Sequence, residues 1–168
     1  MATRRHIFVF LAMIWIVLPA TNGVAMAGQW LLGDLSIMDA TGKRIYGQYI
    51  SVFLTRQAVP VPHDPMLDTM ERHHRLDRIN QMHMDFFKTF SRYRPQPRYL
   101  VAHTESSDTG NFAFLDIPAG DYFVVVTFPA MIGGYKVAWQ EPVTIRPGRT
   151  GYVSLGEENL ILPTDRRD

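Results

Sequence analysis

Residues Thr109–Val125 read TGNFAFLDIPAGDYFVV, and this stretch carries the strongest fold signal in the chain. Phe112 and Phe114 are two residues apart, so both side chains lie on one face if the segment is a strand. Residues 118–121 read Pro-Ala-Gly-Asp, which favours a tight turn. Beyond the turn, apolar residues again occupy every second position: Tyr122, Val124, Val126 and Phe128. The stretch therefore predicts two strands with apolar faces, joined by a turn.

Further strands are expected on both sides of this stretch. Residues 28–57 read as strand, turn and strand, with the turn at Asp39–Lys43. Ile50, Val52 and Leu54 then alternate, although Phe53 interrupts the pattern. From residue 98 onwards, turn signals recur roughly every 8–15 residues, a spacing typical of an antiparallel sandwich. The sequence predicts a mainly β protein, an antiparallel Greek-key β-sandwich of about seven strands with one inserted amphipathic α-helix.

The spacing G-x-F-x-F, a short gap and P-x-G-x-Y-x-V, which runs from Gly110 to Val124, resembles the signature of carboxypeptidase regulatory-like domains. The segment from Leu32 to Leu54 resembles the first hairpin of that family. The resemblance covers roughly residues 30–57 and 98–156. It implies a small transthyretin-like (prealbumin-like) β-sandwich. It implies no activity, because one fold serves many functions.

The first 27 residues have the order of a secretory signal. Arg4 and Arg5 precede an apolar run from Ile7 to Leu18, and a small-residue Ala-Met-Ala triplet follows. A signal peptide at residues 1–27 is expected, cleaved between Ala27 and Gly28. The alternative is an uncleaved anchor, but the apolar run is shorter than the roughly 20 residues that span a bilayer. The protein is therefore predicted to be periplasmic or secreted and to meet the membrane only through this signal peptide during export.

The amino-acid composition argues against several classes of protein function. The chain has 168 residues, with 17 Lys and Arg against 16 Asp and Glu, and a formal net charge of +1. Nucleic-acid binders usually carry a clear basic excess, so no nucleic-acid partner is expected. Cysteine is absent, which excludes disulfides, thiolate nucleophiles and all-cysteine zinc sites. The expected layout is one sandwich domain at residues 28–162, with a helical insertion at about 63–94, and a tail at 163–168.

The segment between the two β-rich regions predicts the amphipathic helix. Asp64 is a suitable N-cap and Pro65 a suitable first residue, while Pro95 ends the pattern. One face carries an apolar stripe: Leu76, Ile79, His83, Phe86, Phe87 and Phe90. Because exposed aromatic stripes are rare on soluble monomers, the stripe is expected to pack on an open sheet face, with docking of a partner as the alternative.

Partner-binding residues are predicted in this stripe and in the loop around Gly133 and Gly134. They are Phe86, Phe87, Phe90, Met131, Ile132 and Tyr135. Loops on rigid sandwiches often carry recognition, although apolar loop residues can also fold back on the sandwich edge. The expected partner is an unidentified protein or cell-envelope component.

The opposite helix face offers metal ligands. On a helical wheel, five side chains fall within roughly 80° of one another. They are Met70, His73, His74, Asp77 and Met84. Imidazole with thioether suits copper, and imidazole with carboxylate suits zinc. Neither His73 nor His74 has a second histidine at i+4, so a solvated helix face is the alternative interpretation.

No catalytic residue and no cofactor is predicted. Cysteine is absent and no serine lies in a G-x-S-x-G motif, so an activated nucleophile is not indicated. A hydrolase of the transthyretin-like group would end in Tyr-Arg-Gly-Ser, whereas this chain ends in Asp-Arg-Arg-Asp. The leading hypothesis is an exported, non-enzymatic β-sandwich that acts as a structural or accessory protein-interaction domain. The alternatives are metal (Cu/Zn) binding through the helix and a transthyretin-like hydrolase.

Overall fold

The computed structural model describes residues 28–164, so the predicted signal peptide at residues 1–27 lies outside the described part of the chain. The strands are β1 (Gln29–Met38), β2 (Arg44–Tyr46), β3 (Ser51–Thr55), β4 (Leu100–Glu105), β5 (Asn111–Ile117), β6 (Gly120–Val126), β7 (Met131–Ile132), β8 (Tyr135–Lys136), β9 (Trp139–Ile145) and β10 (Gly151–Leu155). The helices are the 3₁₀ turns η1 (Leu67–Thr69) and η2 (Glu157–Asn159) and the long helix α1 (Arg72–Tyr93). Seven of these strands have five or more residues, which agrees with the predicted number.

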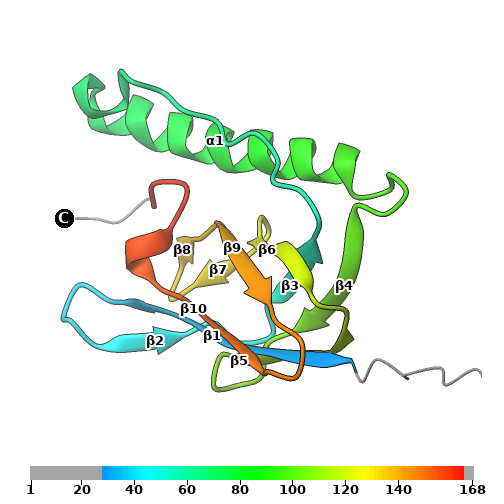
Figure 1. Ribbon diagram of the computed structural model, residues 1–168. Coiled ribbons are helices and arrows are strands. Elements are labelled where there is room, and N and C mark those ends of the chain that lie inside the picture. Colours follow the sequence, from blue (N-terminus) through cyan, green and yellow to red (C-terminus); the bar gives the residue numbers. More distant parts are fainter. Residues whose placement is uncertain (1–27, 165–168) are drawn as a thin grey trace, which may run out of the picture.

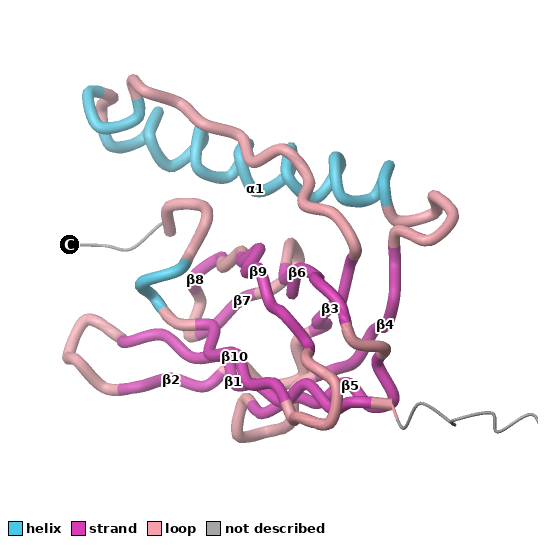
Figure 2. Tube along the Cα trace, in the orientation of Figure 1, coloured by secondary structure: helices cyan, strands magenta, loops and turns pink. Residues whose placement is uncertain are grey.

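The described elements form three layers. One sheet has the order β4-β3-β6-β9, and α1 lies across its outer face, so we call it the covered sheet (Figure 1). The second sheet contains β10, β1 and β5, with the short β2 also paired to β1. Figure 2 shows α1 as one uninterrupted helix joined to the covered sheet by loops at both ends. The prediction of a mainly β sandwich with one inserted helix is confirmed.

The core between the two sheets explains the spacing of the sequence motif. Phe112, Phe114 and Tyr122 all contribute buried side chains to it. The Tyr122 hydroxyl donates to the Pro118 carbonyl at 2.8 Å, so the ring that fills the core also fastens the Pro-Ala-Gly-Asp turn. Trp139, fully buried, donates its indole N–H to the Gly156 carbonyl at 2.7 Å. Tyr122 and Trp139 therefore fill the core with their polar atoms satisfied.

One strand pairing differs from the predicted antiparallel pattern. Strand β1 pairs antiparallel with β5 and β2 but parallel with β10, where Leu31 is opposite Gly151 and Leu35 is opposite Leu155. Strand β9 belongs to the covered sheet, and the turn at residues 146–150 carries the chain across to the second sheet. Because the connection crosses between sheets, β10 need not run antiparallel to its new neighbour as in a hairpin.

A second core lies between α1 and the covered sheet. Phe86 and Phe90 are buried there, and the Phe90 ring lies 4.9 Å from that of Phe53. Val125, on β6, also faces this core. The predicted packing of the helix stripe on an open sheet face is confirmed, and Phe53 interrupts the alternation in its strand because both faces of that strand are buried.

The helix begins later than predicted. Its N-cap is Glu71, not Asp64. The Asp64 carboxylate instead accepts the backbone N–H of Met66 at 3.0 Å and the Nε–H of Arg78, which ties the preceding loop to the helix. Among the described residues, no helix has the length and apolar character that crossing a membrane requires.

Removing the Phe90 ring tests whether α1 is an integral part of the fold. We expect Phe90→Ala to lower the free energy of unfolding by about 3–5 kcal/mol, because the ring is fully buried between helix and sheet. Ser91→Ala, at the neighbouring exposed position, should change it by less than about 0.5 kcal/mol. Urea unfolding followed by both circular dichroism and tryptophan fluorescence measures this. A loss below about 1 kcal/mol for Phe90→Ala would contradict the packing.

The Asp64–Arg78 pair predicts a contribution to acid sensitivity. The Arg78 guanidinium and the Met66 N–H hold the pKa of Asp64 below its ordinary value. This carboxylate therefore stabilises the fold above its unfolded pKa of about 3.9, and the contribution is lost as pH falls through the lower folded pKa. Asp64→Asn should make the fall in unfolding free energy between about pH 5 and pH 2 shallower. Arg78→Gln should have the same effect, and a wild-type slope in both variants would exclude the pair as a source.

Candidate functional site

A short hairpin carries the loop around Gly133 and Gly134 that is predicted to bind a partner. Strands β7 and β8 are joined by Gly133 and Gly134, whose φ angles of 57° and 88° fit a type I′ turn. A Cβ on Gly133 would lie 2.6 Å from Ile45 Cδ1, so the hairpin packs against β2 as closely as a glycine allows. The glycines thus shape the turn and permit its approach to the second sheet.

This approach forms an open pocket of about 590 Å³, which we call the hairpin pocket. The β1–β2 turn and β2 line one side, and Met131–Gly133 line the other. Met131 is 48% exposed, whereas the side chain of the next residue, Ile132, is buried. Two adjacent cations, Lys43 and Arg44, belong to the wall. The pocket therefore combines an apolar floor with a basic rim.

One carboxylate, that of Asp39, stabilises the β1–β2 turn that carries the basic rim. Asp39 Oδ1 accepts the Thr41 hydroxyl at 2.6 Å and the backbone N–H groups of Thr41 and Lys43 at 2.8 and 2.9 Å. The Thr41 hydroxyl first, and then the Lys43 N–H, lower the pKa of Asp39. The Asp39 carboxylate therefore stabilises the β1–β2 turn. Within residues 28–164, neither Lys43 nor Arg44 forms an ion pair.

The structure divides the predicted partner-binding residues into two groups. Met131 and Ile132 line the hairpin pocket, and Tyr135, half-buried, lies on the same hairpin. Phe86 and Phe90 are 0% and 1% exposed, so the prediction that they contact a partner is wrong: the covered sheet already occupies them. Phe87 is half-buried, and its ring lies 5.8 Å from that of Phe128.

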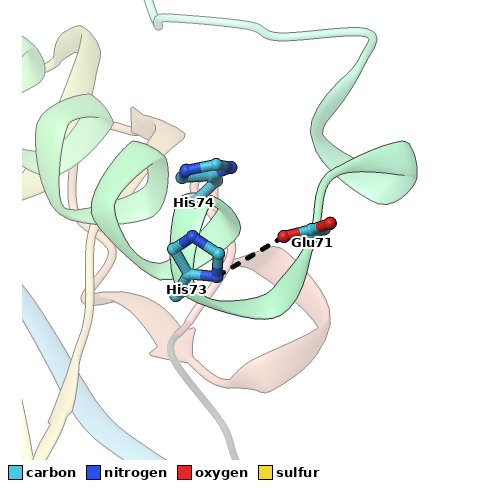
Figure 3. Close-up of side chains that lie close together, drawn as sticks. All are labelled: Glu71, His73 and His74. Carbon is cyan, nitrogen blue, oxygen red and sulfur yellow. Dashed lines mark ion pairs between the residues drawn. The ribbon is translucent and has the colours of Figure 1, made fainter.

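The predicted metal ligands are only partly brought together. Glu71, His73 and His74 each offer one ligand atom, and these atoms all lie within 4.8 Å of one another. Figure 3 shows the two imidazoles close together at the start of α1, with the carboxylate beside the His73 ring. The two ring centroids are 3.8 Å apart, and His73 Nδ1 lies 3.8 Å from Glu71 Oε2.

The other three predicted ligands are not part of this group. Met70 precedes the helix and packs against the second core, because α1 starts only at Arg72. Asp77 is on the helix but outside the ligand cluster, and Met84 lies about 15 Å beyond His74 along the helix axis. Glu71 was missed, although a carboxylate two residues before a histidine pair was visible in the sequence.

No family model matches the chain, and no curated protein matches it in sequence. Solved structures give a similar β-sandwich at low identity. A Pseudomonas aeruginosa protein described as a candidate for carbohydrate binding is 17% identical, over 79% of this chain and 90% of its own, with a TM-score of 0.40. The minor pilin GBS52 of Streptococcus agalactiae is 14% identical, over 78% of this chain and 44% of its own, with a TM-score of 0.45.

The major pilin of Bacillus cereus is 14% identical, over 80% of this chain and 30% of its own, with a TM-score of 0.38. The chain thus spans less than half the length of both pilins. At these identities the likeness concerns the fold alone. Membership of the carboxypeptidase regulatory-like family stays a prediction.

The turn of the hairpin can be tested by substitution at Gly134. Its φ of 88° is a backbone conformation in which alanine is strained, although a Cβ at this position would have no other atom within 4 Å. Gly134→Ala should therefore cost about 1 kcal/mol of unfolding free energy, and Gly134→Asn less, because asparagine tolerates positive φ. Thermal unfolding of both variants measures the difference. An alanine variant as stable as the wild type would contradict the turn geometry.

Proposed function

We propose that this protein is an exported, non-enzymatic accessory module that binds an extended acidic segment of a cell-envelope or secreted protein at the hairpin pocket. Export is inferred from the signal-like residues 1–27. The observation that carries the binding proposal is the pocket itself, where an open strand edge, an apolar surface and two adjacent cations meet.

The strand edge supplies backbone groups for a peptide. Among the described strands, β2 pairs with β1 alone, so one side of β2 has no partner strand. An exposed edge of this kind is a template for an added strand. Peptides bound by strand addition gain affinity from main-chain hydrogen bonds and specificity from pockets for alternate side chains. An extended peptide is therefore the ligand shape that the pocket favours.

Side chains around that edge favour an acidic sequence with apolar residues. Lys43 and Arg44 offer two positive charges to carboxylates. Met131 and Ile45 offer apolar contact, and methionine adapts to varied partners. In a strand of alternating acidic and apolar residues, the acidic side chains lie on one face and the apolar side chains on the other. The acidic face would contact the basic rim, and the apolar face would contact the apolar floor.

Charge reversal at the rim tests the proposal. The probe is a fluorescently labelled peptide of about eight alternating Glu and Val residues, measured by fluorescence anisotropy. The wild-type protein should bind it, and the double variant Lys43→Glu, Arg44→Glu should bind roughly tenfold more weakly, because two attractions become repulsions. A peptide of alternating Lys and Val should not bind the wild type.

The matched control carries the same change in net charge elsewhere. Arg146 and Arg149 are exposed in the β9–β10 turn and do not line the pocket. Arg146→Glu with Arg149→Glu should leave peptide affinity within about twofold of the wild type. If both double variants bound the peptide equally weakly, the loss of affinity would be due to net charge alone, and the proposed site would be refuted. No binding of the Glu-Val peptide would refute the proposed ligand chemistry.

A further inference from the structure

We infer that Glu71, His73 and His74 form a Zn²⁺ site at the start of α1. The site is independent of the hairpin pocket, which shares no residue with it. Two imidazoles and one carboxylate are a ligand set that zinc proteins use with a fourth position left open. Sulfur ligands would favour copper, but Met70 packs against the second core and Met84 lies about 15 Å beyond His74 along the helix axis.

The distances are within reach of coordination. Zinc binds imidazole nitrogen and carboxylate oxygen at about 2.0–2.2 Å, so two ligand atoms in a tetrahedral site lie about 3.4 Å apart. The cluster spans up to 4.8 Å without an ion, and the His73–Glu71 pair is already at 3.8 Å. Closing the remaining gap requires the ligand atoms to approach one another by up to about 1.4 Å, which side-chain rotations supply.

Nothing in the local packing of the described residues opposes that shift. The side chains of His73 and Glu71 are 68% and 79% exposed, and His74 is also exposed. The backbone is nevertheless fixed, since Glu71 is the N-cap and both histidines lie in the first turn of α1. The three ligands therefore come from four consecutive residues on one rigid element, which limits the entropy lost on binding.

Two local charges act against a cation here. The helix N-terminus is the positive end of the macrodipole, and Arg72 lies between the ligands in sequence. The dipole weakens binding of a divalent cation by up to roughly thirtyfold at an exposed terminus, because its effect applies to each of the two charges. The Glu71 carboxylate supplies a compensating negative charge, so we expect the third ligand to matter as much as either imidazole. Water or a donor from another molecule would complete the coordination.

Calorimetric titration of the untagged protein with zinc chloride tests the inference. We expect one Zn²⁺ per chain. His73→Ala, His74→Ala and Glu71→Gln should each weaken binding at least tenfold, because loss of even an outer partner of a metal ligand costs roughly 10–100-fold. The matched control is His63→Ala, at a histidine upstream of the cluster, which should bind like the wild type.

Cobalt substitution gives a second readout. Co²⁺ bound in a four-coordinate site absorbs visible light, and Zn²⁺ should abolish the absorption by competition. An equal loss of affinity in His63→Ala, unchanged affinity in the three ligand variants, or one metal bridging two chains would each overturn the site. Circular dichroism of every variant separates loss of ligands from loss of fold.

Discussion

Burial of the covered sheet on both faces is the constraint on which the rest of the structure depends. Along β6, Val124 and Val126 face the core between the sheets, whereas Val125 faces the core beneath α1, and all three are fully buried. Full burial of a side chain of this size contributes about 1.5–3 kcal/mol. Without α1, the outer face that includes Phe53 and Val125 would lie in water. The helical insertion is therefore part of the fold, not an appendage to it.

Burial of both faces of the covered sheet could be predicted from the sequence only in part. Alternation at Phe112 and Phe114, and again from Tyr122 to Val126, was enough to predict a sandwich, because apolar residues at every second position indicate a strand with one buried face. The second buried face shows as an interruption of the pattern at Phe53, and an interruption alone does not say what covers it. The parallel pairing of β1 with β10 could not be predicted, since local patterns encode strands but not which distant strand lies beside them.

The same limit applies to the candidate sites. Met131 and Ile132 were predicted because a Gly-Gly turn among apolar residues is a local signal. The opposing wall at Lys43 and Arg44 is almost ninety positions earlier in the chain, and only the fold brings it to the hairpin. The predicted placement of Met70 on the metal-binding helix face was wrong for another reason: the helical wheel assumed a helix from Asp64, and α1 begins at Arg72. A shift in the start of a helix removes upstream residues from its faces.

The helix that closes the second core also positions the hairpin pocket. Lys136, at the end of β8, donates to the Asn80 side chain of α1 at 2.6 Å, and Phe128, just before β7, packs edge-on against Phe87. Gly133 meets Ile45 on the other side. The hairpin is thus held between α1, which makes two of these contacts, and β2, which makes the third. A two-stranded hairpin of this length is not stable by itself, so the shape of the pocket follows from the packing of α1.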